Sequence, residues 1–210
     1  MISHQHKCIF VHIPRTGGTS IEDVIWGPDR RSRTEAQLWM GIAESGRNKY
    51  QTGGLQHLLA RQIRQEVGPA VFDAVFKFSF VRNPWDKAVS QFIYMRKRRD
   101  LRELVGMRHD STFKDYLMRI EKVRHVQWYG QWEFLLDDNG DLLVDCVGRF
   151  ESFDKDVQSV LSRLGIVCDA VPHEFKGDRL HYETYYDQES LEIVGHRYRR
   201  DIERFGYTSD

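Results

Sequence analysis

The sequence has few of the residues that mark disulfide-bonded or membrane-spanning proteins. Only 3 of its 210 residues are cysteine and 5 are proline. Cys8, Cys146 and Cys168 are odd in number and lie outside any Cys-X-X-Cys pair, which predicts reduced thiols in a cytoplasmic protein. No stretch approaches the roughly 18 apolar residues of a membrane-spanning helix. The polar start, Met1–Lys7, predicts that there is no secretory signal.

An excess of charge of either sign is also absent. Lysine plus arginine and aspartate plus glutamate number 31 each, so the net charge is zero. This balance gives no general attraction to nucleic acid or acidic lipid, and an anion site must therefore be local. A hydrophobic fraction of 40% and a charged fraction of 30% are typical of a globular protein. The length predicts one domain over residues 1–210.

Apolar runs and helical periodicities alternate along the chain. Cys8–Ile13 is a short apolar run without strict alternation, as expected for a strand covered on both faces, and Val75–Val81 is predicted to be a second strand. A turn at Asp138–Asp141 predicts a hairpin between Phe134–Leu136 and Leu142–Val147. The expected helices run from Thr19 or Ser20 to Trp26, Leu55 to Val67, Pro84 to Met95, Ser111 to Ile120, Ser152 to Gly165 and Gln188 to Phe205. This alternation predicts an α/β fold with a largely parallel central sheet flanked by helices.

The loop after the first expected strand has the composition of an anion-binding site. Ile13–Ser20, named here the anion loop, reads Ile-Pro-Arg-Thr-Gly-Gly-Thr-Ser. Gly17 and Gly18 would let backbone N–H groups approach an anion, and the following helix presents its positive end. Arg15 adds a permanent charge, and the hydroxyl donors are Thr16, Thr19 and Ser20. A plain tight turn before a helix is the alternative interpretation.

A nucleoside-triphosphate kinase is the competing interpretation of this loop. Its pattern, GxxxxGK[ST], places a lysine directly before the hydroxyl residue that holds magnesium. Here Thr19 follows Gly18, and the cation stands earlier, at Arg15. The departure disfavours a magnesium-dependent kinase.

A second phosphate contact is indicated where the second expected strand ends. Arg82 follows that strand, Asn83 is placed to cap the next helix, and Ser90 lies nearly two turns into it. An arginine at a strand end and a hydroxyl on the next helix can meet one phosphate from two directions. Taken alone, the pair is weak evidence, because a surface salt bridge and a solvent-facing serine are commoner.

Together the two segments resemble the signature of P-loop-like sulfotransferases that use 3'-phosphoadenosine 5'-phosphosulfate (PAPS). Within them the sequence is most similar to the carbohydrate-type group that includes heparan and dermatan 2-O-sulfotransferases. The resemblance continues through Val147–Glu151, His173–Tyr186 and Asp201–Tyr207. It implies a P-loop-like three-layer fold, PAPS as co-substrate without a metal, and transfer of a sulfuryl group to a hydroxyl of a carbohydrate or small metabolite.

The resemblance also implies roles for individual residues. The anion loop would bind the 5'-phosphosulfate, with Arg15 where the family usually has lysine, and Arg82 with Ser90 would bind the 3'-phosphate. Because arginine is effectively never deprotonated, Arg15 is expected to stabilise the departing phosphate by its charge. A late segment would close over the 3'-phosphate or adenine with Lys176, Arg179 and Tyr182.

The acceptor hydroxyl needs a base, and His57 is the expected one because a histidine can take up a proton near neutral pH. His12 and Glu151 are the alternatives. Gly27–Thr52 matches no family segment and is expected to help shape the acceptor pocket. A degenerate module that binds nucleotide or glycan without turnover is a further alternative. The sequence leaves the acceptor and the oligomeric state open.

Overall fold

A computed structural model describes residues 1–27, 57–171 and 180–209, and the chain divides into two compact units. Unit 1 is drawn from Met1–Val81 and Glu133–Lys176, and unit 2 from Arg82–Trp132 and Gly177–Asp210. Residues 28–52 of the predicted connection lie outside the described residues. The single domain expected from the length stays a prediction.

Unit 1 contains a four-stranded sheet in the order β1-β2-β3-β4. The strands are β1 (Ile2–Ser3), β2 (Cys8–Val11), β3 (Phe76–Val81) and β4 (Cys146–Arg149). β2, β3 and β4 run parallel, whereas β1 pairs with β2 in the antiparallel sense. The predicted α/β architecture, an open and largely parallel sheet flanked by helices, is confirmed.

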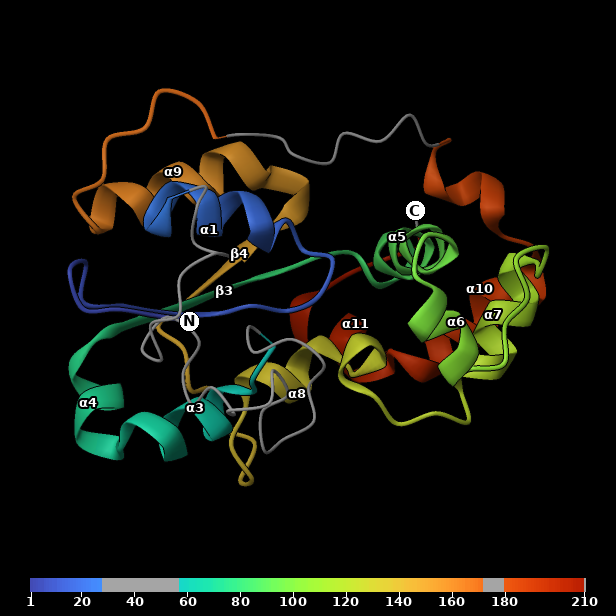
Figure 1. Ribbon diagram of the computed structural model, residues 1–210, viewed down its shortest axis with the longest axis horizontal. Helices are drawn as coiled ribbons and strands as arrows, with labels where there is room; N and C mark the ends of the chain where they lie inside the picture. The colour runs from blue at the N-terminus through green and yellow to red at the C-terminus, as the bar shows by residue number, and fades with distance from the viewer. Residues whose placement is uncertain (28–56, 172–179, 210) are drawn as a thin grey trace. The chain divides into compact units, whose positions relative to one another are not determined.

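Helices cover both faces of this sheet, as Figure 1 shows. α1 (Gly18–Trp26) and α9 (Phe153–Arg163) lie on one face, and α3 (Ala60–Val67) and α4 (Pro69–Ala74) lie on the other. The 3-10 helix η3 (Phe150–Ser152) precedes α9. Rings from neighbouring strands stack in the core, with the centroids of Phe10 and Phe78 5.0 Å apart. Burial on both sides explains why β2 is apolar at every position, whereas β3 alternates apolar residues with Lys77 and Ser79, which are buried as well.

Unit 2 is helical. Its elements are α5 (Pro84–Arg96), α6 (Arg99–Leu104), α7 (Phe113–Ile120), η2 (Val126–Trp128), η4 (Tyr182–Tyr185), α10 (Gln188–Arg197) and α11 (Arg199–Phe205). The predicted cap of α5 is confirmed, since Asn83 Oδ1 accepts from the backbone N–H of Trp85 at 3.0 Å and of Asp86 at 3.4 Å. Aromatic rings hold the helices together: Phe113 packs edge-on against Phe92 and Tyr186, with centroids 5.4 and 4.9 Å apart.

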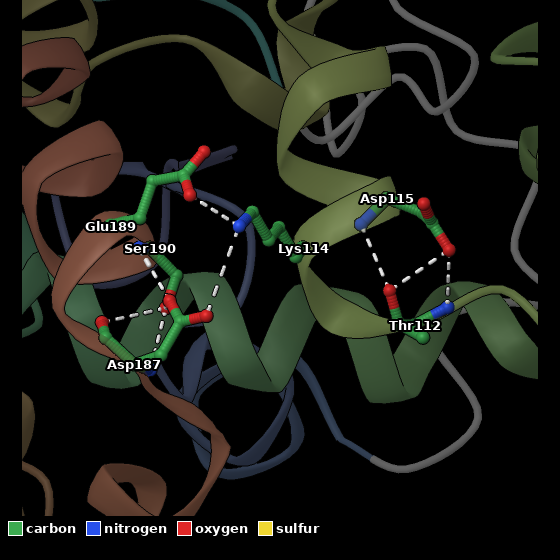
Figure 2. A network of polar contacts seen from close by, with 6 residues as sticks. All are labelled: Thr112, Lys114, Asp115, Asp187, Glu189 and Ser190. Atoms are coloured by element: carbon green, nitrogen blue, oxygen red, sulfur yellow. Dashed lines mark hydrogen bonds and ion pairs between the residues drawn. The ribbon is translucent and has the colours of Figure 1, made fainter.

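A polar network at the helix ends joins α7 to α10 within unit 2. Figure 2 shows its members, which are Thr112, Lys114, Asp115, Asp187, Glu189 and Ser190. Two capping boxes form its ends, Thr112 with Asp115 and Asp187 with Ser190. Lys114 connects them by ion pairs to Glu189 and Asp187. Exposed ion pairs contribute about 0–1 kcal/mol, so the caps, at about 1 kcal/mol each, carry most of the stabilisation here.

Several local predictions were wrong. Phe134 and Leu135 belong to a short helix, α8 (Gln131–Leu135), and not to a hairpin strand; Leu136 makes a single bridge with Leu142. The reason is a distant carboxylate: Asp201 accepts the N–H groups of Gln131 and Trp132, both at 2.8 Å, and so stabilises the start of α8. A turn does form here, at Asp137–Gly140, one residue before the predicted Asp138–Asp141.

The other corrections concern helix ends. α3 begins at Ala60 and not at Leu55, because Leu59 before it has an extended backbone. α1 begins at Gly18, and its cap is Gly17 in the left-handed conformation, so neither Thr19 nor Ser20 caps it. The expected C-terminal helix is divided into α10 and α11 at Tyr198. There the buried tyrosine leaves helical geometry because its ring packs under Lys87 and its hydroxyl donates to the carbonyl oxygen of Trp128 (3.4 Å).

Candidate active site

The anion loop lies in unit 1, between the end of β2 and the first turn of α1. Arg15 and Gly17 have positive φ angles of 67° and 83°, and Thr16 between them does not. Where left-handed and right-handed backbone conformations alternate, successive N–H groups point to the same side, as in anion-binding nests. For a non-glycine residue such as Arg15 the left-handed conformation costs about 1–2 kcal/mol. Backbone strain of this kind collects at ligand-binding sites.

Both glycines of the loop are required by close packing. A Cβ atom on Gly17 would come within 2.5 Å of the Phe153 ring, and one on Gly18 within 2.2 Å of His12 Nε2. The loop is therefore held between an aromatic ring of α9 and a histidine ring that follows β2. Such contact leaves no room for a larger residue at either position.

The hydroxyl groups of the loop differ in their surroundings. Thr16 is fully buried, and its Oγ1 donates to the carbonyl oxygen of Ile13 at 2.9 Å. Its single hydroxyl proton is thus used within the loop, and its contact with an anion would come from the backbone N–H. Ser20 is buried and Thr19 is partly exposed.

The first turn of α1 suits an anion. Gly17 caps the helix without a side-chain hydrogen bond in the described part of the chain, and the turn that follows contains no acidic residue. The first N–H groups of a helix have no partner within the helix, and the helix dipole favours negative charge beside them.

A buried histidine–glutamate contact lies behind the loop. His12 Nδ1 and Glu22 Oε1 are 2.6 Å apart, and their side chains are only 4% and 1% exposed. Because the other ring nitrogen of His12, Nε2, faces Gly18, the ring is enclosed on both of its nitrogen-bearing sides. This enclosure disfavours His12 as the base. Glu151, the third candidate, is exposed on η3.

His57 lies beside His12 in unit 1, with the two ring centroids 4.7 Å apart. Its Nδ1 is 3.0 Å from the carbonyl oxygen of His12. A carbonyl oxygen only accepts, so Nδ1 carries the proton and the neutral ring keeps a lone pair on Nε2. Burial, with nearby His12 as a smaller cause, lowers the pKa of His57 from 6.5 to about 3. The ring is therefore neutral at physiological pH, the form that accepts a proton.

The low pKa of His57 predicts acid lability. The unfolded chain binds a proton at His57 as the pH falls below 6.5, but the folded chain does so only near pH 3. Stability is thus complete above pH 6.5 and is lost as the pH falls from there towards 3. With allowance for partial exposure, we expect the wild type to lose about 1–2 kcal/mol more than His57→Gln between pH 7 and 4.5. Urea unfolding at the two pH values measures this, and equal losses would contradict it.

Arg82 is held by side chains of unit 2. It directly follows β3, and its Nε donates to Asp86 Oδ2 at 2.7 Å, which orients the guanidinium. The side chain of Gln131 makes two hydrogen bonds to the Arg82 backbone. Its Oε1 accepts from the Arg82 N–H (2.8 Å), and its Nε2 donates to the Arg82 carbonyl oxygen (2.7 Å). Ser90 is buried on α5. Neither Asp86 nor Gln131 was predicted; the four-residue spacing to Asp86 was a usable signal, but nothing in the sequence marks Gln131.

Asp201 continues this arrangement. It accepts the N–H groups of Gln131 and Trp132, and burial raises the pKa of its carboxyl from 3.8 to about 6. The carboxylate thereby fixes the start of α8, from which Gln131 reaches Arg82. Asp201, Gln131 and Arg82 form one chain of contacts within unit 2.

The predicted site residues belong to both units. Arg15, Ser20 and His57 belong to unit 1, and Arg82 and Ser90 to unit 2. Tyr182, in η4 of unit 2, has its ring centroid 6.5 Å from that of Tyr186, and its hydroxyl donates to the carbonyl oxygen of Ser209 (3.4 Å). Lys176 and Arg179 lie outside the described residues.

The described residues contain neither a cluster of metal ligands nor a membrane-spanning helix. No three His, Cys, Asp or Glu side chains among residues 1–27, 57–171 and 180–209 are grouped so that they could hold a metal ion. Within the same ranges no helix has the length and apolar character needed to cross a bilayer.

Comparison with known proteins gives the family. A model described as "Sulfotransferase family" matches residues 1–208. The chain belongs to the sulfotransferase family. Membership supports sulfuryl transfer as the general class of reaction.

One curated relative supplies no further detail. It is an uncharacterized protein from Archaeoglobus fulgidus, 28% identical over 107 residues, which cover 51% of this chain and 82% of the relative. No solved structure matches this sulfotransferase.

Proposed function

We propose that the chain transfers a sulfuryl group from PAPS to a hydroxyl group of a carbohydrate or a small metabolite. The observation that carries the proposal is the anion loop: two left-handed residues, two glycines packed against His12 and Phe153, and a first helical turn without an acidic residue all favour a bound anion. Family membership supports sulfuryl transfer as the chemistry performed there.

The donor supplies an activated sulfuryl group whose leaving group is a phosphate. The backbone N–H groups of Gly17 to Thr19 would hold the 5'-phosphosulfate. Ser20 would add its hydroxyl, because its own N–H donates to the Gly17 carbonyl oxygen (3.2 Å). Arg82 and Ser90 would hold the 3'-phosphate, which fits an arginine whose guanidinium is oriented by Asp86. The late segment would add Lys176, Arg179 and Tyr182.

Arg15 takes the place of the family's usual lysine. Its guanidinium keeps its charge at any physiological pH and offers several N–H donors to a phosphate. It would stabilise the negative charge that develops on the departing oxygen, a contribution that is large in enzymes where the donors are fixed in advance. A proton for that oxygen would have to come from another source.

His57 would accept the proton of the acceptor hydroxyl at Nε2. Because Nδ1 donates its proton to the His12 carbonyl oxygen, the lone pair stays on Nε2. A low pKa makes a weak base, but it also keeps the ring unprotonated and ready at neutral pH.

Calorimetry tests the donor. We expect the product-like 3'-phosphoadenosine 5'-phosphate to bind with micromolar affinity, equally well with magnesium or with a chelator, because fixed cations and N–H groups neutralise its charge. ATP should bind more weakly, since it lacks a 3'-phosphate. Tight, magnesium-dependent binding of ATP alone would instead identify a kinase. Binding without transfer of radiolabelled sulfate to any member of a broad acceptor panel would indicate the degenerate module.

A further inference from the structure

Three of the contacts of His12 each reach a different part of the proposed site in unit 1. Its ring nitrogen Nδ1 pairs with Glu22 on α1. Its Nε2 edge lies where a side chain of Gly18 would be, directly against the anion loop. Its carbonyl oxygen is 3.0 Å from His57 Nδ1. One residue thus touches the helix, the loop and the expected base.

We propose that His12 is a positioning residue that holds the anion loop and the His57 ring in fixed register, with Glu22 as the group that orients it. The inference rests on the proposed function, because it assigns how that site is held in place. It also gives His12 a role other than that of the base.

Stability alone does not account for a histidine and a glutamate at these positions. Both side chains are almost fully buried, and removing charged or polar groups from water costs several kcal/mol, which a single pair seldom recovers. An apolar pair of similar volume is often as stable or more so. An apolar pair has no directional hydrogen bond. In the native pair the 2.6 Å contact to Glu22 fixes the rotation of the His12 ring and therefore the position of its edge under Gly18.

The two functions of His12 are carried by different atoms, so they can be tested separately. The ring supports the loop and is changed by substitution. The carbonyl oxygen, which receives His57 Nδ1–H, belongs to the backbone and survives substitution. In the wild type at pH 7, ¹⁵N NMR of the histidine rings should therefore show His57 with its proton on Nδ1, the reverse of the preference of free histidine. A proton on Nε2 would overturn the proposal, and this readout needs no donor or acceptor.

Glu22→Gln tests the support of the loop. The amide fills the same space but carries no charge, so we expect the fold to persist. The Kd for 3'-phosphoadenosine 5'-phosphate should rise about 10- to 100-fold as the loop loses its register. Glu192→Gln, the same change at an exposed position of α10, is the matched control and should leave the Kd unchanged. An unchanged Kd in a folded Glu22→Gln protein would overturn the proposal.

A second variant covers the case in which Glu22→Gln does not fold. The apolar pair His12→Phe with Glu22→Leu removes both polar groups together and keeps the volume, so thermal unfolding should show a folded protein. Its Kd and its rate of sulfate transfer should nevertheless be worse by about tenfold or more. Wild-type values in this variant would mean that His12 only fills space. Failure of the wild type to bind the bisphosphate would instead reject the proposed function, independently of the His57 tautomer.

Discussion

His57→Gln should lower kcat for sulfate transfer by about 10²–10⁴-fold, the usual contribution of a general base. The Kd for 3'-phosphoadenosine 5'-phosphate should stay within about twofold, because the ring acts on the acceptor and the donor groups are unchanged. Glutamine keeps an amide N–H for the His12 carbonyl oxygen and loses only the basic nitrogen. Transfer of radiolabelled sulfate, with calorimetry on the same protein, measures both quantities.

The matched control for this result is His109→Gln, which makes the same change at an exposed histidine between α6 and α7. It should have wild-type kcat. If His57→Gln also retains wild-type turnover, His57 is not the base, and exposed Glu151 becomes the next residue to test.

Gly18→Ala should damage binding and stability together. The added methyl carbon would lie 2.2 Å from His12 Nε2, and the ring cannot move aside without giving up its 2.6 Å contact with Glu22. Overpacking of this kind costs about 1–3 kcal/mol. The displaced loop should bind 3'-phosphoadenosine 5'-phosphate about 100-fold more weakly. Urea unfolding and calorimetry give the two numbers.

Gly195→Ala makes the same chemical change where there is room for it. Gly195 lies inside α10, and its added carbon would be 3.7 Å from Trp85, an ordinary contact distance. Alanine favours a helix interior over glycine by about 1 kcal/mol, so this variant should gain stability and keep its affinity. Two equal outcomes for the two glycines would show that the packing under Gly18 is looser than the structure has it.

Much of the fold could be predicted from local patterns. β2, β3, α5 and α7 are where the apolar runs and capping residues placed them, because each is governed by neighbours within about one turn or strand. The failures have distant causes. α8 begins where Asp201 accepts two N–H groups from residues about 70 positions earlier, and no sequence window includes both partners. The break at Tyr198 depends on the contacts of a buried ring.

The site shows the same division. The anion loop is predicted from its composition alone, which places glycines, hydroxyl residues and an arginine between a strand and a helix. The groups that hold the loop and Arg82 in place do not. Glu22 reads as an ordinary helical glutamate and Gln131 as an ordinary polar residue, and each takes its importance from a contact that only the folded chain makes.

Gln131 has a consequence for how this part of the chain can vary in evolution. Its amide receives the N–H of Arg82 and donates to the carbonyl oxygen of the same residue, as the backbone of an adjacent strand would. A side chain here substitutes for a missing strand at one residue. Only a side chain with a donor and an acceptor side by side can make both hydrogen bonds. Glutamate lacks the donor, leucine lacks both groups, and asparagine is one carbon too short to reach. Position 131 should thus tolerate far fewer substitutions than an ordinary polar residue would.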